Sequence, residues 1–479
     1  MNKLTINTIL ALPILFLFGS CMVNEESKEY YENGQLLSIG KTFNGKPTGE
    51  WKYYYEDGQL EQIGKIVDGK HSGEWEIYHR NGQVEQMGGF INDLRNGEWK
   101  FYYKNGKLVS VGVLIDEVKT GEWKEYHDNG QLRNIGYFSL GKETGKWETF
   151  FSNGQLKQTG NYLDGLPSGE WLTYHENGKK YQLAKYTNGK LVGKYKSYFE
   201  SGYLESIGEM SDGYKTGEWK NYFANGELKE TGNYSLGEKS GSWKEYYPSG
   251  MLHQTGNYSF GKKTDEWVSY FEIGSIKQKG EFSDDVQNGK WYEYHENGQL
   301  KSSGLVSNGE KEEYWQGYYN TGKTAYTGSY HIGNKINGWK FYSNDGGIGR
   351  EGNYESDKQT GEWKYYHKNG KIKNTGAFKE GLQNGEWKLY NPEGQLTKQG
   401  NFVDGKQNGK WQDYFNNGQL YTVNIWDMGK LMHVVSCFDG RGNNLDLGTL
   451  KDGNGTVKRY DFGGKLLEEY EIVNGKRKQ

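Results

Sequence analysis

The chain has few cysteines, no surplus of charge of one sign and, beyond its first residues, no helical periodicity. Only two of its 479 residues are cysteines, Cys21 and Cys437. If Cys21 carries lipid, as argued below, no disulfide forms within one chain and packing alone holds the fold. The net charge of −3 comes from interspersed acidic and basic residues, which argues against a nucleic-acid partner.

The chain is also poor in apolar residues, and this narrows the class of fold. Hydrophobic residues make up only 33% of it and the mean hydropathy is −0.98, too polar for a conventional two-layer domain of this length. Such polarity is typical of disorder, but aromatic residues account for 16% of the chain and argue against disorder. A solenoid reconciles the two observations, because each of its repeats buries surface only against its neighbours.

Tryptophan is abundant, and its spacing reveals an internal repeat. Fifteen of the sixteen tryptophans lie on a common spacing of 24 residues, and Tyr195 fills the one vacant position. The sixteenth, Trp426, lies at another recurring position of the same repeat. Regular spacing of this kind is the signature of a repeat architecture, so we assign these tryptophans a structural role. They are Trp51, Trp75, Trp99, Trp123, Trp147, Trp171, Trp219, Trp243, Trp267, Trp291, Trp315, Trp339, Trp363, Trp387 and Trp411.

Other positions recur with the same period. With the tryptophan counted as position 0, position +3 is tyrosine in every repeat from Tyr54 to Tyr414 except Phe150, and position +7 is always glycine. Position +13 is glycine in most repeats, and position +15 is usually aromatic. The glycines therefore recur at fixed positions of the repeat and do not indicate a flexible linker.

Each repeat is predicted to be a β-hairpin. Two aromatic-rich segments of strand length are separated by Asp-Gly or Asn-Gly, as at Asp57-Gly58, which is the strongest short-range signal for a hairpin. A two-residue turn there, with positive φ at both residues, places Trp51 directly opposite Gly64 and position +15 opposite position −2. We expect the tryptophan ring to cover that bare glycine, and charged residues to occupy the other face of the sheet.

The repeat pattern resembles a known family. The sequence Gly-Glu-Trp-x-x-Tyr-x-x-Asn-Gly-x-Leu, found at Gly121–Leu132 and begun again at Gly169–Gly178, is similar to the MORN repeat in its bacterial variant form. The resemblance implies hairpin repeats, association with membrane lipids or proteins and, in bacteria, antitoxin-like proteins; it implies no catalytic residue. Leucine-rich repeats have a comparable period, but their leucine signature is absent.

The predicted fold is an all-β, elongated, solenoid-like, single-layer antiparallel meander of 24-residue hairpins. A terminal cap is expected, because a solenoid must end its apolar face. The predicted organisation is a signal peptide at 1–20, a short tether at 21–26, MORN-like hairpin repeats at 27–430, and degenerate repeats forming a C-terminal cap at 431–479.

The N-terminus has the features of a bacterial lipoprotein signal. An apolar run from Thr5 to Phe18 is too short for a membrane span and is typical of a signal peptide. It ends in Phe18-Gly19-Ser20-Cys21, which resembles a lipobox, where lipid is attached to the cysteine. We therefore expect lipidation at Cys21 and a membrane-anchored location in the bacterial cell envelope, at the outer membrane or exposed on the surface.

The histidines and carboxylates follow the repeat and do not cluster into a site. Glutamates recur at position −1, as Glu50 does, beside a lysine, which predicts a solvated cross-strand ladder of charges and not a catalytic pair. We expect no catalytic residue, no metal site and no cofactor. Five of the nine histidines lie at position +4, where other repeats have tyrosine or phenylalanine, and are interpreted as aromatic substitutes: His79, His127, His175, His295 and His367.

The sequence thus predicts a non-catalytic, lipid-anchored envelope scaffold that binds a protein or the membrane. Two alternatives stay open. One is a surface protein that binds glycans of the cell wall through aromatic rows, and the other is an antitoxin-like or immunity protein that captures a toxin. The repeat is broken at 180–195 and at 308–324, and these segments are candidate binding sites or hinges.

Overall fold

A computed structural model of the chain describes residues 24–478, and these residues form strands, turns and loops without any helix. The described residues separate into two compact parts, residues 24–238 and residues 239–478. The predicted signal peptide at 1–20 and the predicted lipidation site Cys21 lie outside the described residues. Residues 24–26 of the predicted tether already belong to the first strand, which pairs with the second.

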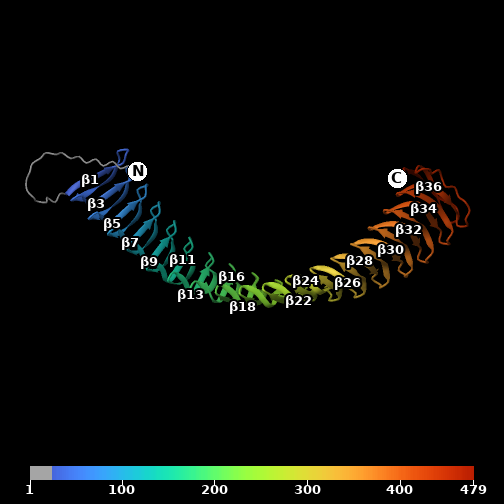
Figure 1. The fold of residues 1–479 in the computed structure, drawn as a ribbon, viewed down its shortest axis with the longest axis horizontal. Coiled ribbons are helices and arrows are strands. Elements are labelled where there is room, and N and C mark those ends of the chain that lie inside the picture. The colour runs from blue at the N-terminus through green and yellow to red at the C-terminus, as the bar shows by residue number, and fades with distance from the viewer. Residues whose placement is uncertain (1–23, 479) are drawn as a thin grey trace, which may run out of the picture. The chain divides into compact units, whose positions relative to one another are not determined.

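In the first part, successive strands pair antiparallel in the order of the chain and build one open layer of hairpins (Figure 1). At one place the strand that follows β14 is divided into the short β15 and β16, and β14 pairs with both. The strands are β1 (Asn24–Tyr30), β2 (Leu36–Phe43), β3 (Lys46–Tyr54), β4 (Leu60–Val67), β5 (Lys70–Tyr78), β6 (Val84–Ile91), β7 (Leu94–Tyr102), β8 (Leu108–Ile115), β9 (Val118–Tyr126), β10 (Leu132–Ser139), β11 (Lys142–Phe150), β12 (Leu156–Leu163), β13 (Leu166–Tyr174), β14 (Lys180–Thr187), β15 (Lys190–Leu191), β16 (Gly193–Tyr198), β17 (Leu204–Ser211), β18 (Tyr214–Tyr222) and β19 (Leu228–Ser235).

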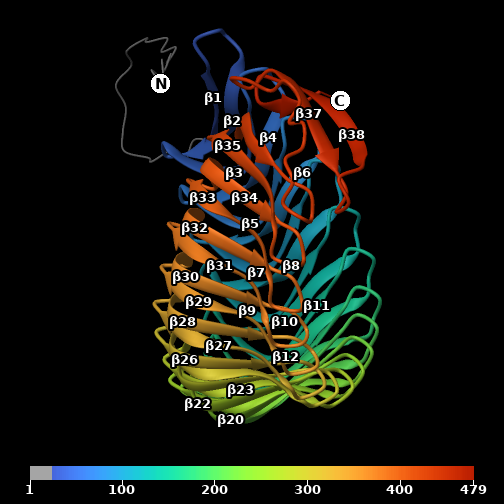
Figure 2. The same cartoon turned by 90° about the vertical axis from the view of Figure 1, so that its right-hand side faces the viewer.

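The second part continues the same pattern through β36 and ends in a separate three-stranded sheet (Figure 2). The strands are β20 (Glu238–Tyr246), β21 (Leu252–Ser259), β22 (Lys262–Tyr270), β23 (Ile276–Ser283), β24 (Val286–Tyr294), β25 (Leu300–Ser307), β26 (Glu310–Tyr318), β27 (Thr324–His331), β28 (Asn334–Tyr342), β29 (Ile348–Glu355), β30 (Lys358–Tyr366), β31 (Ile372–Lys379), β32 (Leu382–Tyr390), β33 (Leu396–Val403), β34 (Lys406–Tyr414), β35 (Leu420–Asp427), β36 (Lys430–Cys437), β37 (Gly455–Tyr460), β38 (Leu466–Val473) and β39 (Lys476–Arg477). The prediction of an all-β meander of hairpin repeats is confirmed.

The two edges of the sheet carry different turns, and this corrects the predicted turn. Asp68 and Gly69, which join β4 to β5, both have positive φ (52° and 81°) and form the tight two-residue turn. The segment at Asp57-Gly58 is instead part of a three-residue loop in which only Gly58 has positive φ (86°). The carboxylate of Asp57 accepts a hydrogen bond from the backbone amide of Gln59 at 3.1 Å, which explains why Asp or Asn recurs at this position.

The predicted register at the tryptophan is nevertheless confirmed, because a second irregularity compensates for the longer loop. Beside the loop, Tyr54 pairs with Leu60, and Glu61 is an extra residue in its strand. This bulge shifts the pairing by one residue and brings Trp51 opposite Gly64. An error of one residue in the loop was thus cancelled by a bulge of one residue in the strand.

The tryptophan ring covers a different glycine from the predicted one. Trp75, not Trp51, lies against Gly64, and Trp51 lies against Gly40 of the preceding strand. The strand of Trp75 bulges just before the tryptophan where it faces the preceding hairpin, and a bulge of this kind redirects the next side chain. The ring is held there by a 3.1 Å hydrogen bond from its Nε1 to the backbone oxygen of Lys65.

In each part, the buried face of the sheet carries a row of aromatic rings in which aliphatic residues such as Val306 separate some of the tryptophans. Phe90, at position +15, lies between two tryptophans, with its ring centroid 6.1 Å from Trp75 and 5.1 Å from Trp99 and both contacts edge to face. Such contacts add to the stabilisation from burial. All the tryptophans of the 24-residue series except Trp147 are buried, with exposures between 0% and 7%. A single layer therefore buries large rings by stacking neighbouring repeats.

The break at 180–195 preserves this packing by two linked changes. A Cβ atom added to Gly88 would lie 2.6 Å from the ring of Trp99, so the covered position normally requires glycine. In the broken repeat Ala184 occupies that position, and Tyr195 replaces the tryptophan that would cover it. Ala184 is only 3% exposed, and its neighbours pair in the usual register. A six-membered ring is smaller than an indole, so we expect it to leave room for the extra methyl group.

The C-terminal segment lies over the last strands of the meander. Leu431 of β36 forms a buried cluster with Val457 of β37 and Ile472 of β38. The backbone amide of Leu431 donates to the carbonyl of Gly475 at 3.0 Å, which ties the turn between β38 and β39 to β36. The apolar surface at this end of the second part is thereby covered by the chain itself.

Candidate functional site

The face opposite the tryptophans carries rows of ion pairs. Glu50 and Lys52 approach to 3.4 Å, and Glu98 and Lys100 approach to 3.0 Å. Both pairs join residues two apart on one strand, so for these glutamates at position −1 the predicted cross-strand ladder is corrected to pairs within single strands. Their side chains are between 41% and 66% exposed, and exposed pairs of this kind contribute little to stability. This face is a solvated surface available for contact.

The five periodic histidines replace tyrosine in one specific hydrogen bond. The hydroxyl of Tyr55 donates to the carbonyl of Tyr78 in the next hairpin at 2.6 Å. In the following repeat, Nε2 of His79 lies 3.1 Å from the carbonyl of Tyr102, which is the equivalent oxygen. The other four histidines make the same contact, at distances from 2.8 to 3.0 Å. Each ring donates from Nε2 and links one hairpin to the next.

This geometry separates two substitutions that the sequence treats as equivalent. Replacing all five histidines by tyrosine retains the inter-hairpin hydrogen bond, so we expect the urea midpoint of the parent. Replacing all five by phenylalanine removes it, at a cost of about 0.5–1.5 kcal/mol for each site. Hydrogen exchange measured by mass spectrometry on the acceptor strands reads the effect locally. Equal protection in the two variants would contradict the assigned role.

On the polar face of the second part, several departures from the repeat converge on one hollow of about 1120 Å³. Position −1 holds Glu, Lys or Ser in the other repeats but Tyr314 and Gly338 in two successive ones. Position +9 is Thr324 in this region, whereas the other repeats have an aliphatic residue there, except for Lys180. Gly338 contributes no side chain, and Thr324 is smaller than the usual leucine. The hollow thus exists because bulk is missing where the repeat normally supplies it.

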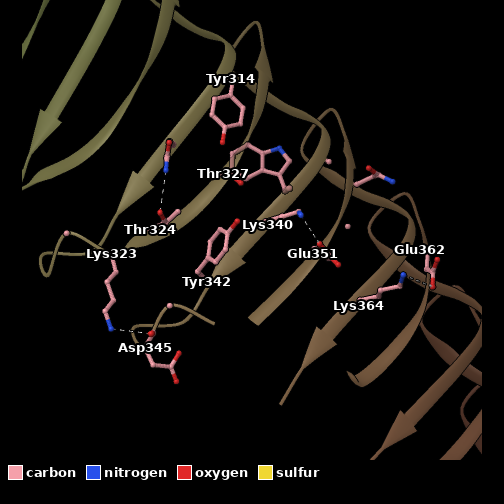
Figure 3. A pocket seen from close by; sticks show the side chains of 17 residues that line it. Tyr314, Lys323, Thr324, Thr327, Lys340, Tyr342, Asp345, Glu351, Glu362 and Lys364 are labelled. Carbon is pink, nitrogen blue, oxygen red and sulfur yellow. Dashed lines mark hydrogen bonds and ion pairs between the residues drawn. The ribbon is translucent and has the colours of Figure 1, made fainter. Parts of the chain in front are cut away.

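The walls of the hollow combine an aromatic ring with fixed polar groups (Figure 3). Tyr314 is 57% exposed, a large apolar area for a residue on this face. Lys340 and Glu351 form an ion pair at 3.6 Å, and Lys364 and Glu362 form another at 3.9 Å. These pairs hold donors and acceptors in place around the floor.

Neighbouring groups orient the acceptors of the hollow. The hydroxyl of Tyr366 donates to Oε1 of Glu351 at 2.5 Å, and burial together with this bond raises the pKa of Tyr366 to about 12. The carboxylate of Asp345 accepts hydrogen bonds from the Ser343 hydroxyl and the Gly347 amide, which lower its pKa. Both residues therefore keep their protonation states over the physiological pH range.

A second hollow, of about 720 Å³, continues from the first and shares Asp345 with it. It lies at the loop edge, where Ser343 occupies position +4 in place of the usual aromatic residue or histidine. Sequence analysis singled out 308–324 but missed Gly338 and Ser343. The available signal was the replacement of bulky residues by small ones in two consecutive repeats.

A second unusual surface lies in the first part, along the edge formed by the two-residue turns. It consists of exposed apolar side chains from four consecutive hairpins, each between 41% and 88% exposed. Backbone hydrogen bonds of 2.9 to 3.1 Å join each turn to the preceding hairpin, so these side chains lie next to one another. We call this surface the turn stripe: Ile91, Leu94, Ile115, Val118, Leu140, Leu163 and Leu166.

The turn stripe includes a residue in an unfavourable conformation. Leu140 has a φ of 48° and is 88% exposed, at a turn position where most repeats have Asp or Asn. Asp and Asn tolerate this left-handed conformation better than leucine. Leucine there gains no burial within the described residues, so stability of the fold does not explain it.

Residues 24–478 hold no group of three or more histidine, cysteine, aspartate or glutamate side chains arranged to bind a metal. Cys437 is buried, and burial raises the pKa of its thiol to about 11. Among the described residues, no helix has the length and apolar character needed to cross a membrane.

A protein-family model described as "MORN repeat variant" matches twelve segments that together cover more than half of the chain: 26–44, 47–67, 72–92, 95–113, 119–139, 143–164, 167–188, 215–235, 239–259, 287–308, 359–380 and 383–404. The chain belongs to this family. The matched MORN segments coincide with hairpins of the sheet. Residues 309–358, between two matched segments, include the departures Tyr314, Thr324, Gly338 and Ser343.

Comparison with solved structures finds toxin-complex chains at low similarity. The crystal structure of TcdB2-TccC3 matches with 13% identity and a TM-score of 0.13, over 94% of this chain and 28% of that chain. The Photorhabdus luminescens Tc holotoxin pore matches with 14% identity and a TM-score of 0.14, over 94% of this chain and 27% of that chain. No curated protein matches the MORN-repeat chain.

Proposed function

We propose that this MORN-repeat chain is a non-catalytic scaffold, anchored by lipid at Cys21 in a bacterial cell envelope, that binds a protein partner through its turn stripe. The observation that carries the proposal is the row of exposed apolar side chains, with Leu140 held at a φ of 48°. A contiguous exposed apolar row marks a surface that another molecule covers. Residues kept in a sparsely populated conformation cluster at functional sites.

The repeat architecture supports a scaffold in a further way. Because each hairpin contacts mainly its sequence neighbours, apolar residues placed at one position of successive repeats form a continuous row. A row of this kind offers a partner the same contact several times over. The turns that present it are joined by backbone hydrogen bonds, so little ordering is required on binding.

The partner is tested by capture from native envelope extracts in detergent, with identification by mass spectrometry. The variant Leu140→Asp, Leu163→Ser, Leu166→Lys uses residues that other repeats carry at these positions, so the fold is preserved. We expect the variant to lose the partner that the parent captures. The matched control is Phe260→Asp, which changes a turn residue outside the stripe that is 90% exposed in the second part.

A partner retained by the stripe variant, or lost equally from the control, contradicts the proposal. So does stripe-dependent binding of the unlipidated protein to phospholipid vesicles, because the occupant is then the membrane.

The lipid anchor is tested separately. Cys21→Ala is expected to move the protein from the membrane fraction to the soluble fraction, because a lipobox cysteine carries more than one acyl chain and stable anchoring requires more than one. Fractionation followed by immunoblotting measures the shift, and Cys437→Ala is the control. Equal membrane association of the Cys21 variant and the parent rules the anchor out.

A further inference from the structure

Two consecutive repeats of the second part have lost bulk on one face while gaining an exposed ring. Gly338 replaces a long polar side chain, Thr324 replaces an aliphatic one and Ser343 replaces an aromatic one. Tyr314 is the only aromatic residue at position −1 of the series. Unrelated substitutions would not be expected to lie close together. Tyr314, Thr324 and Gly338 nevertheless line the first hollow, and Ser343 lines the second.

The packing of the buried face beneath the hollow is preserved, so these changes do not disrupt the fold. On the other face of the same repeats, Gly317 takes the place of a larger residue, and Tyr326 fills the space from the adjacent strand. The ring of Tyr326 stacks on Trp339 at 5.7 Å. Trp315 and Trp339 are 2% and 1% exposed. The buried face is repaired while the polar face is left open.

The charge of the hollow selects against an ion. Its lining includes three lysines, Lys323, Lys340 and Lys364, and three carboxylates, Asp345, Glu351 and Glu362. Two of the lysines are paired with carboxylates, and Nζ of Lys323 donates to the backbone oxygen of Asp345 at 3.2 Å. A phosphate or a cation would therefore compete with bonds that already exist. A neutral ligand rich in hydroxyl groups can instead donate to the carboxylates and accept from the lysines.

We propose that the hollow binds a neutral saccharide, with one sugar ring stacked on Tyr314 and the hydroxyl groups of the next sugar ring bonded to the Lys340–Glu351 pair. A sugar ring presents an apolar face of C–H groups that packs against an aromatic ring, and an edge of hydroxyls that needs fixed donors and acceptors. Tyr314 supplies the first and the ion pair supplies the second. The volume of about 1120 Å³ accommodates these two rings with their substituents, and the second hollow extends the site for a further ring.

The site differs from a pocket for a protein side chain. It is open and lined by charged and amide groups, and it offers no enclosed apolar cavity for a hydrophobic residue. Asn353 and Gln316 add amide groups that both donate and accept. This mixture suits a chain of hydroxyl groups along an open surface.

Affinity electrophoresis tests the proposal with gels that contain a neutral polysaccharide: a β-glucan, an α-mannan, a galactan or soluble glycol chitin. We expect at least one of them to retard the full-length protein. Tyr314→Ala and Gly338→Glu are expected to weaken that binding about ten-fold or more, by loss of the stacking ring and by filling of the floor. Tyr314→Phe, which keeps the ring, is expected to bind as the parent does.

Two controls make the result decisive. Tyr137→Ala removes a tyrosine of similar exposure, 47%, on the same face of the first part, and it should leave binding unchanged. Gly338→Glu carries the residue most common at this position, and circular dichroism checks that it folds. The proposal is overturned if no neutral polysaccharide retards the parent, if only anionic ones do, or if Tyr314→Ala and Gly338→Glu bind as tightly as the parent.

Saccharide binding by the hollow and protein binding by the turn stripe can be tested independently. The stripe variant should keep saccharide binding while losing its protein partner, and Tyr314→Ala should do the reverse. Loss of both activities in either variant indicates misfolding, which circular dichroism reveals.

Discussion

Replacing both Trp99 and Trp123 by alanine is expected to destabilise the first part severely, whereas deleting the whole repeat 97–120 is expected to cost far less. Each tryptophan ring is at most 3% exposed and contacts Phe101, which lies between the two. Truncation to alanine removes these contacts, so each substitution costs about 3–5 kcal/mol. The deletion removes one complete repeat and rejoins Asn96 to Gly121, which restores an equivalent interface.

Urea unfolding of the two variants beside the parent, followed by circular dichroism, measures the difference. The deletion also re-forms the stacked turns, because the amide of Gly141 then meets the carbonyl of Arg95 in place of that of Lys119. A deletion variant that unfolds at lower urea than the double tryptophan variant contradicts the repeat-by-repeat account of stability. The control is removal of 12 residues, because it breaks the 24-residue period and should unfold the region.

Gly88→Ala is expected to destabilise the chain, and a second change, Trp99→Tyr, is expected to rescue part of the loss. The new Cβ atom would lie 2.6 Å from the indole, which is held by its Nε1 bond to the Gly89 carbonyl and by the ring of Phe90. Overpacking of this kind costs about 1–3 kcal/mol. The chain itself combines Ala184 with the smaller ring of Tyr195, so we expect the smaller ring to accept the methyl group.

A double-mutant cycle measures this coupling. Hydrogen exchange of the β6 and β7 amides gives the local opening free energy of the parent, the two single variants and the double variant. We expect the double variant to be more stable than the sum of the single changes by about 1–2 kcal/mol, since the two sites are in direct contact. Additive effects would show that the link between Ala184 and Tyr195 is accidental. The reciprocal pair, Ala184→Gly with Tyr195→Trp, provides the matched control.

Several features of the site were within reach of the sequence, and others were not. The period of 24 residues placed every tryptophan on one face, because residues at the same position of successive hairpins share a face. The interruption at 308–324 was visible as a departure from the period. Gly338 was missed because glycine is so frequent in this chain that one more, at an unusual position, did not stand out. The turn stripe was missed because single exposed apolar residues are common and gain meaning only when they are adjacent.

The sequence by itself determined the repeat, its length, the hairpin and the family. Each of these follows from local propensities and from the same 24-residue pattern, which recurs along the chain. Only the tertiary structure decided which edge carries the two-residue turn at Asp68-Gly69, which glycine each ring covers and where a hollow opens. Those features depend on contacts between neighbouring hairpins: a bulge turns the tryptophan toward the preceding strand, and missing side chains in adjacent repeats add up to one space.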